Sequence, residues 1–187
     1  MVHIVGISGS LRKASVHSGI LRAIAKNFPA GHTFDLVVPD LPLFNSDLEP
    51  HLPQAVKDFR ARLKKADGFI FASTEYNFGI SSPMKNAIDW GSRGDKDGNL
   101  FNDKAGGAIS GGGGLGGHRS VLHLNDCAVY VNMHMMNHPQ VNFRIFENKI
   151  FDPATGDLVD EKAEAAVQNF LKFYINWAVR IHSSRSA

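Results

Sequence analysis

The chain has 187 residues, with 20 Lys and Arg against 18 Asp and Glu, and a formal net charge of +2 at pH 7. This length is typical of one domain with one substantial core, so we expect residues 1–187 to form a single domain. The near balance of charge argues against a nucleic-acid-binding protein, which carries a basic stripe or patch.

Strand-like and helix-like patterns alternate along the chain. Residues 68–72 are almost wholly apolar, as in a strand buried on both faces of a parallel sheet. In residues 53–66 the apolar side chains recur at helical spacing, with Lys and Arg opposite them. We expect strands at residues 3–7, 33–37, 68–72, 105–110 and 130–135. We expect helices just beyond Ser15 and at residues 53–66, 82–90, 117–128 and 160–181.

The helix at residues 82–90 has signals at both ends. Ser82 is its expected cap, Pro83 its first helical residue, and Gly91 lies just past its end. The five alternations predict an α/β fold of three layers, a five-stranded parallel sheet of order 2-1-3-4-5 with helices on both faces. In such sheets ligands bind beyond the carboxyl ends of the strands near the switch point, here the ends of strands one, three and four.

The loop after the first strand suits a phosphate group. Ser8, Ser10 and Ser15 offer hydroxyls, and backbone N–H groups at the start of a helix point at the same spot. Arg12 adds a guanidinium. No Gly-Lys-Ser or Gly-Lys-Thr occurs in the chain, which excludes the GxxxxGK[ST] triphosphate loop, and a dinucleotide fingerprint would need a third glycine. We therefore expect a phosphate monoester; the alternative is that Ser15 or Ser18 only caps the helix.

Two further loops follow the third and fourth strands. In residues 73–79, Tyr76 or Phe78 can pack on a flat ring, while backbone amides pair with the polar edge of a heterocycle. The alternative is that these aromatic side chains lie in the core. In residues 110–117, the glycines permit close backbone approach, so that their N–H groups can surround an anionic or electron-rich atom. The alternative there is a flexible linker.

Four motifs in this order carry a resemblance to a known family. They are residues 9–13 with Ser15, then Glu75-Tyr76-Asn77, then residues 83–90, and finally Ser110 with the glycine run. Together they resemble the NADPH-dependent FMN reductase family of flavodoxin-like fold, and within it the plant-type NAD(P)H:quinone oxidoreductases and the bacterial quinone/chromate reductases. The resemblance covers residues 2–177.

The resemblance implies that FMN binds without a covalent bond, with its phosphate on the first loop and its ring on the other two. His17 stands where members often carry Asn. The implied FMN-binding residues are Ser8, Ser10, Leu11, Arg12, Ser15, His17, Ser18, Thr74, Glu75, Tyr76, Asn77, Phe78, Ser110, Gly111, Gly112, Gly113 and Gly114.

The resemblance also implies an enzyme whose chemistry belongs to the flavin rather than to a catalytic side chain. NADPH or NADH would give a hydride to the flavin N5, and a quinone would then take two electrons in a ping-pong scheme. Alternatives are a chromate, azo or flavin reductase of the same family, or a non-enzymatic flavodoxin-like electron carrier, although such carriers are typically acidic.

Family members are usually homodimers or homotetramers in which a neighbouring subunit completes the site. Arg93 matches a family arginine near the flavin, where it would contact a substrate anion or another subunit. Glu147 is a carboxylate to which the sequence assigns no role.

The remaining reactive residues predict little further chemistry. Nine histidines lack a cysteine-rich or carboxylate-rich cluster beside them, so we expect no metal site. The single Cys127 excludes an internal disulfide and agrees with a reducing compartment, so we expect a cytoplasmic protein. Residues 1–12 lack a secretion signal, and no apolar run approaches the ~20 residues that cross a bilayer.

Overall fold

The computed structural model describes residues 1–93, 96–146 and 149–185. Its strands are β1 (His3–Ser8), β2 (Thr33–Val37), β3 (Gly68–Tyr76), β4 (Gly79–Ile80), β5 (Ala105–Gly112), β6 (His134–Met135) and β7 (Val141–Arg144). Its helices are α1 (Val16–Lys26), α2 (Gln54–Lys65), α3 (Ser82–Ser92), α4 (His118–Tyr130) and α5 (Glu161–Ser184), with a short 3₁₀ helix at Ser46–His51. None of the helices in these ranges is long and apolar enough to cross a membrane.

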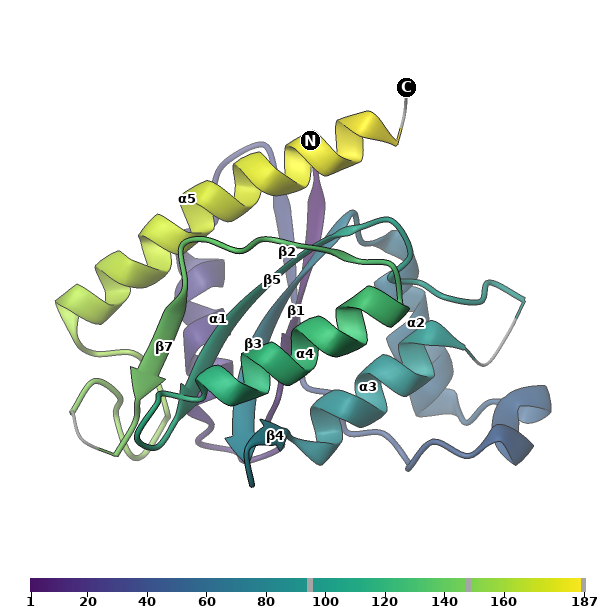
Figure 1. The fold of residues 1–187 in the computed structure, drawn as a ribbon, viewed down its shortest axis with the longest axis horizontal. Coiled ribbons are helices and arrows are strands. Elements are labelled where there is room, and N and C mark those ends of the chain that lie inside the picture. The colour runs from purple at the N-terminus through teal and green to yellow at the C-terminus, as the bar shows by residue number, and fades with distance from the viewer. Residues whose placement is uncertain (94–95, 147–148, 186–187) are drawn as a thin grey trace.

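The sheet has the order β2-β1-β3-β5-β6, and β1, β2, β3, β5, β6 and β7 pair in parallel. Because β4 is a short antiparallel strand beside β3, the fourth and fifth parallel strands along the chain are β5 and β6. The predicted flavodoxin-like α/β fold is therefore confirmed. The parallel strands run toward the same edge, at the bottom of Figure 1, where β4 lies.

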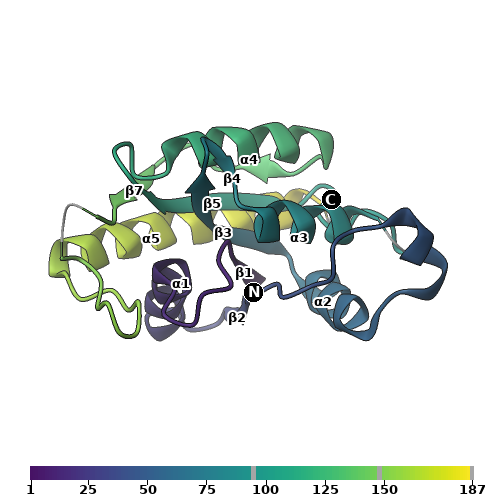
Figure 2. The same ribbon diagram turned by 90° about the horizontal axis from the view of Figure 1, so that it is seen from below.

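Two apolar clusters cover the two faces of the sheet. One contains Phe69, Phe71 and Trp90 with the apolar sides of α2, α3 and α4. The other contains Ile70 and Phe170 with the apolar sides of α1 and α5. Alternate residues of β3 thus enter opposite cores, as the pleat of a strand buried on both faces requires. Figure 2 shows α4 and α1 on opposite sides of the sheet.

The expected strand at residues 130–135 is wrong in its bounds. The helix α4 continues through Tyr130, and Asn132 adopts a positive φ of 52° in the turn that follows. Only β6 then pairs with the start of β5, while β7 pairs with its end. The fifth position of the sheet is therefore shared by two short strands, and the second, β7, lies where the sequence predicted no strand.

The expected loops after strands three and four are shorter than predicted. The strand β3 runs on to Tyr76, and β5 runs on to Gly112. Asn77 and Phe78 form a two-residue turn into β4, with φ values of 50° and 66°. Both values lie in the left-handed region that two-residue hairpins favour. These two site segments are thus held in the sheet over much of their length.

The expected ends of α3 also need correction. The cap is Ser81, whose hydroxyl accepts the N–H of Met84, and Ser82 is already helical. Gly91 lies inside the helix, where an added Cβ would stand 2.4 Å from the ring of Phe101. The buried guanidinium of Arg60 donates to the carbonyl oxygens of Trp90 and Gly91, which satisfies the end of the helix from outside.

The segment that precedes α5 holds α1 against the sheet. The carbonyl oxygen of Gly156 lies so close to α1 that a Cβ at Gly19 would stand 1.8 Å from it. Arg22 donates to the Asp157 carboxylate at 2.6 Å, and this ion pair lowers the pKa of Asp157. Only glycine permits this approach at position 19. The start of α1, which carries the first candidate loop, is fixed in place as a result.

Candidate functional site

The carboxyl ends of β1, β3 and β5 surround a cavity of about 150 Å³. This is the edge at which the sequence predicted a site, on both sides of the point where the strand order reverses. The cavity is lined by Ser10, Arg12, Ser15, Val16, His17, Thr74, Glu75, Tyr76, Gly111, Gly112, Gly113, Ile145 and Phe146. Ten of these residues were predicted, and all three predicted segments contribute.

Two serines of the first loop present donors to the cavity. The hydroxyl of Ser10 accepts the N–H of Arg12, and the hydroxyl of Ser15 accepts the N–H of Ser18 as the cap of α1. Each oxygen therefore keeps its own proton to donate. Ser15 does cap the helix, as the alternative interpretation held, but it also lines the cavity. Two such donors at a helix N-terminus suit an anion.

Ser8 and Ser18 do not line the cavity. Both are buried, and their hydroxyl oxygens lie 3.0 Å apart. Ser8 also donates to the carbonyl oxygen of Ser10. These two side chains thus bind each other and shape the loop. Leu11 is exposed at 45% and also lies outside the lining.

Arg12 is the cationic side chain in the lining. No carboxylate in the described part of the chain pairs with its guanidinium. Its charge acts across the cavity, since it contributes to the lowered pKa of His17. An unpaired guanidinium beside two hydroxyl donors is the combination that binds phosphate.

His17 connects two walls of the cavity. Its Nε2 donates to the carbonyl oxygen of Gly111 at 3.1 Å, which ties α1 to the end of β5. The side chain is 3% exposed, and burial lowers its pKa to about 4. The imidazole is therefore neutral at pH 7, and its Nε2 proton is already used within the protein.

Thr74 carries a polar atom without a partner. Its Oγ1 is buried and makes no hydrogen bond, although the residue lines the cavity. A buried hydroxyl without a partner costs about 1–3 kcal/mol, so it marks a place where a ligand group would restore a bond. Gly113 adds open backbone nearby, because a Cβ there would meet nothing within 4 Å. These features fit a ligand with a polar edge.

Glu75 lines the cavity but uses its carboxylate elsewhere. The Oε2 atom accepts the N–H groups of Arg119 and Ser120 at 3.0 and 3.3 Å. Gly117, which precedes α4, offers no side-chain cap. Glu75 therefore caps α4 from the neighbouring strand and fixes the hairpin that carries Tyr76.

Several predicted residues lie outside the lining. The hydroxyl of Ser110 is buried against Gly116 O and Asn142 Oδ1, at 2.7 and 2.6 Å, and so anchors the glycine loop. Asn77 and Phe78, at the tip of the hairpin, lie beyond the rim of the cavity, and Phe78 is 69% exposed. The side chains outside the lining are Ser8, Leu11, Ser18, Asn77, Phe78, Arg93 and Ser110, and Gly114 is also outside it.

Arg93 stands apart from the other predicted residues. It follows α3 at the end away from the hairpin, and its guanidinium lies 5.3 Å from the centroid of the Phe44 ring. The geometry therefore disfavours a contact, within one chain, between Arg93 and a ligand in this cavity. Glu147 lies outside the described residues.

Sequence reasoning missed one wall of the cavity. Ile145 and Phe146 follow β7, and the ring of Phe146 is 82% exposed. Val16 was missed as well. Residues 141–146 alternate only weakly between apolar and polar side chains, and the sequence therefore predicted no strand there.

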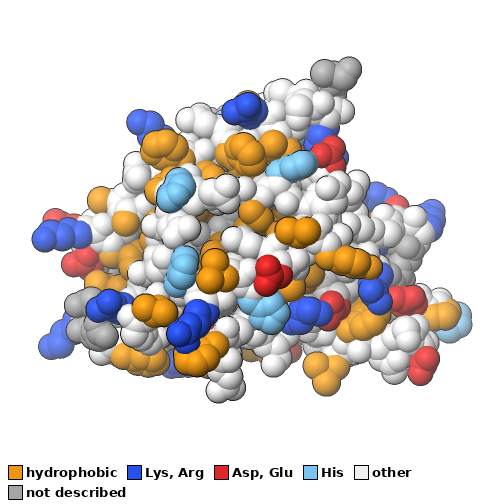
Figure 3. Space-filling model, in the orientation of Figure 1, with side chains coloured by type: hydrophobic (Ala, Val, Ile, Leu, Met, Phe, Trp, Pro, Cys, Tyr) orange, Lys and Arg blue, Asp and Glu red, His pale blue; other side chains and the backbone are white. Residues whose placement is uncertain are grey.

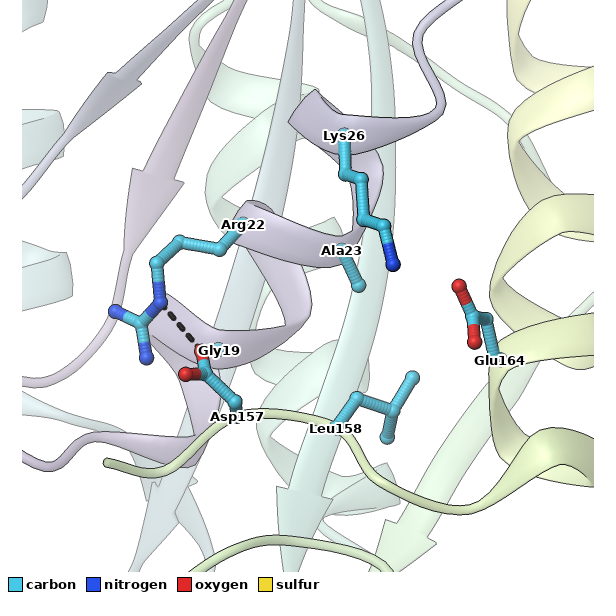
Figure 4. A pocket seen from close by; sticks show the side chains of 7 residues that line it. All are labelled: Gly19, Arg22, Ala23, Lys26, Asp157, Leu158 and Glu164. Carbon is cyan, nitrogen blue, oxygen red and sulfur yellow. Dashed lines mark hydrogen bonds and ion pairs between the residues drawn. The ribbon is translucent and has the colours of Figure 1, made fainter. Parts of the chain in front are cut away.

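Other hollows are larger but lack these features. One of about 340 Å³ lies between α1 and α5, where Arg22 and Lys26 face Asp157 and Glu164 (Figure 4). Arg22 is bound to Asp157 there, and Asn27 donates to Glu164. Another of about 430 Å³ is open and shallow beside α3. Among the described residues, no three His, Cys, Asp or Glu side chains gather to hold a metal.

His17 makes the stability of the fold depend on pH. Because the pKa is about 4 when folded and 6.5 normally, the unfolded chain binds more protons between these values. Neutral His17 makes its full contribution to the free energy of unfolding above pH 6.5. This contribution falls by about 3 kcal/mol as the pH falls to 4. Asn at this position keeps a donor for Gly111, so we expect His17→Asn to lose less stability than the natural chain between pH 7 and 4. Urea unfolding at both pH values tests this, and equal losses would contradict it.

Comparisons with known proteins agree with the fold. The family model for NADPH-dependent FMN reductase matches residues 2–148. A probable NADPH:quinone oxidoreductase 2 of Oryza sativa subsp. japonica is 39% identical over 187 residues, covering 96% of this chain and 90% of that protein. A quinone reductase of Escherichia coli K12 is 32% identical, covering 86% of both. The structure of FerB, a flavoenzyme NAD(P)H:(acceptor) oxidoreductase from Paracoccus denitrificans, superposes with a TM-score of 0.84 at 26% identity, covering 96% of this chain and 98% of FerB. The chain belongs to the NADPH-dependent FMN reductase family.

Proposed function

We propose that residues 1–187 form one FMN-binding domain that acts as an NAD(P)H:quinone oxidoreductase. The observation that carries this proposal is the cavity itself, where the guanidinium of Arg12, two serine donors and a threonine hydroxyl that has no partner among the described residues meet at the carboxyl ends of three parallel strands. Relatives named NADPH:quinone oxidoreductase in plants and quinone reductase in bacteria support the acceptor. When bound, FMN supplies the two-electron chemistry between NAD(P)H and the quinone.

The first loop holds the phosphate in this proposal. Arg12 gives the charge, while Ser10 and Ser15 donate from oxygens that already accept backbone N–H groups. The N-terminus of α1 adds its partial positive charge. Ser8 and Ser18 keep the loop in shape and make no contact with the phosphate, which revises their expected role. His17 acts as a neutral tether to Gly111.

The ring and its polar edge lie against the other walls. Tyr76 offers an exposed aromatic surface, and Gly113, just past the end of β5, would offer a backbone N–H group for charge on the reduced ring. Thr74 gains a partner for its buried hydroxyl. The cavity is smaller than the roughly 300–1,000 Å³ that encloses a drug-sized ligand. We therefore expect the ring to be only partly enclosed, with one face accessible to both NAD(P)H and a planar acceptor.

An absorbance spectrum tests the function directly. Purified protein with FMN bound should lose its flavin band on anaerobic addition of NADPH and regain it on addition of a quinone. A band that ignores NADPH would mean an electron carrier, and no flavin even after reconstitution would overturn the proposal. Relative kcat/KM values for quinone, chromate, azo dye and free flavin then rank the acceptors.

Arg12→Gln tests the assignment of the phosphate loop. A charge-assisted hydrogen bond contributes about 1.5–3 kcal/mol, so FMN should bind roughly tenfold more weakly or worse. Riboflavin lacks the phosphate, and its affinity should stay the same in the variant. Fluorescence titration of both flavins measures the effect. Equal losses for FMN and riboflavin would refute a phosphate contact.

We also propose that the chain forms a homodimer or homotetramer. The outer side of α4 leaves Leu122, Val129 and Tyr130 exposed, at 51%, 80% and 81%. Figure 3 shows hydrophobic side chains along this face of the molecule. Such an apolar surface is typical of a subunit interface.

We further propose that the protein is located in the cytoplasm, because it has a single cysteine and requires NAD(P)H. Cell fractionation tests this location.

Light scattering tests the assembly. We expect the mass of two or four chains for the natural protein and a lower mass for Val129→Lys, because a buried unpaired charge opposes association. A monomer in the natural protein would refute the assembly. Lys162→Glu, a charge change on α5, is the control and should leave the mass unchanged.

A further inference from the structure

Arg119 and Phe78 form an exposed pair beside the rim of the cavity. The guanidinium carbon of Arg119 lies 3.7 Å from the centroid of the Phe78 ring. The other two cation–aromatic pairs, Arg93 with Phe44 and Lys104 with Phe69, are wider, at 5.3 and 5.4 Å. A separation of 3.7 Å is close stacking contact. A guanidinium stacked in this way keeps its N–H donors in its own plane, available to a third group.

The backbone under this pair is unusual. Phe78 has a φ of 66°, a conformation that a bulky residue rarely adopts. Its ring is 69% exposed, so it contributes little to the core that would offset the strain. Strain at such a position persists only where the surroundings enforce it. Here Ile80 N–H bonds to His123, and Glu75 bonds to the start of α4, so the hairpin is held from both strands.

No described carboxylate compensates the charge of Arg119. The carboxylate of Glu75 accepts a hydrogen bond from the backbone N–H of Arg119, not from its guanidinium. In the residues that the structure describes, no carboxylate forms an ion pair with this side chain. A stacked, half-buried guanidinium without a counter-ion is a ready site for an anion.

The position of the Arg119–Phe78 pair indicates which anion it binds. Tyr76, two residues before Phe78, lines the cavity, so the pair stands at its rim. The phosphate of the bound flavin has its own cation, Arg12, on the opposite side of the strand β3. A quinone is neutral and needs no cation. The nucleotide co-substrate, by contrast, reaches the same cavity with a diphosphate and, in NADPH, a further phosphate.

We propose that Arg119, stacked on Phe78, binds a phosphate group of the nucleotide co-substrate and so sets the affinity for NAD(P)H. This inference rests on the proposed function. It assigns a role to the tip of the hairpin, which the sequence placed against the flavin and which lies outside the lining of the cavity.

Steady-state kinetics of the FMN-loaded protein test the proposal. In Arg119→Gln, we expect KM for NADPH to rise roughly tenfold or more, by loss of a charge-assisted bond. The values of kcat, KM for the quinone and FMN content should stay the same. Arg119→Lys should fall between the two, because it keeps the charge but loses the planar donor set. Phe78→Leu should raise the same KM by removing the surface that orients the guanidinium. Arg180→Gln, an equal charge change on the exposed side of α5, is the matched control.

The two nucleotides separate the sources of phosphate. A rise in KM for NADPH alone assigns Arg119 to the 2′-phosphate, and an equal rise for NADH assigns it to the diphosphate; both outcomes support the proposal. An unchanged KM for both overturns it. So does a rise that appears only with a lower mass in light scattering, since Arg119 would then serve a subunit interface. If the natural protein fails to oxidise either nucleotide, the proposed function itself fails, whatever the variants do.

Discussion

The parallel register of β1, β3 and β5 is the constraint on which the rest of the site depends. In this register Ser8 lies opposite Ala72, and Ser73 lies opposite Ser110. Three strands that are buried on both faces thus end at one edge, and their polar residues can emerge only there. The close contact between Gly19 and Gly156 keeps α1 at the same edge. If one of these strands shifted by one residue in this register, its site side chains would point into the apolar clusters on the faces of the sheet.

Polar groups at this edge divide into two kinds. Ser8, Ser110 and Glu75 bind other parts of the protein, and His17 bonds to Gly111. These bonds fix the walls. Other groups keep a proton, a charge or a lone pair for something outside the chain, and they include the unpartnered hydroxyl of Thr74. A loop first satisfies its own buried polar atoms, since an unsatisfied one is costly, and only the remainder is available to a ligand.

This division explains what the sequence could and could not predict. The fold followed from strong local signals, such as the apolar run at residues 68–72 and the helical spacing at residues 53–66. The segments of the site followed as well, because the ends of parallel strands are fixed by topology. Which serine faces inward was not predictable, since Ser8 and Ser10 differ only in the direction that the folded loop gives them. The wall made by Phe146 was missed because β7 pairs with β5 over four residues only, too few for a clear period.

The electrostatics of the site follow from the same geometry. Burial keeps His17 neutral, so Arg12 is the cationic side chain in the lining of the cavity. Glu75 places its negative charge at the start of α4, where the helix dipole and two N–H groups stabilise it. Arg119, the second residue of that helix, stacks its guanidinium on Phe78 rather than pairing it with Glu75. The capping of α4 by Glu75 thus fixes the hairpin and compensates the charge of a carboxylate at the cavity wall. It also leaves the cation of Arg119 at the rim.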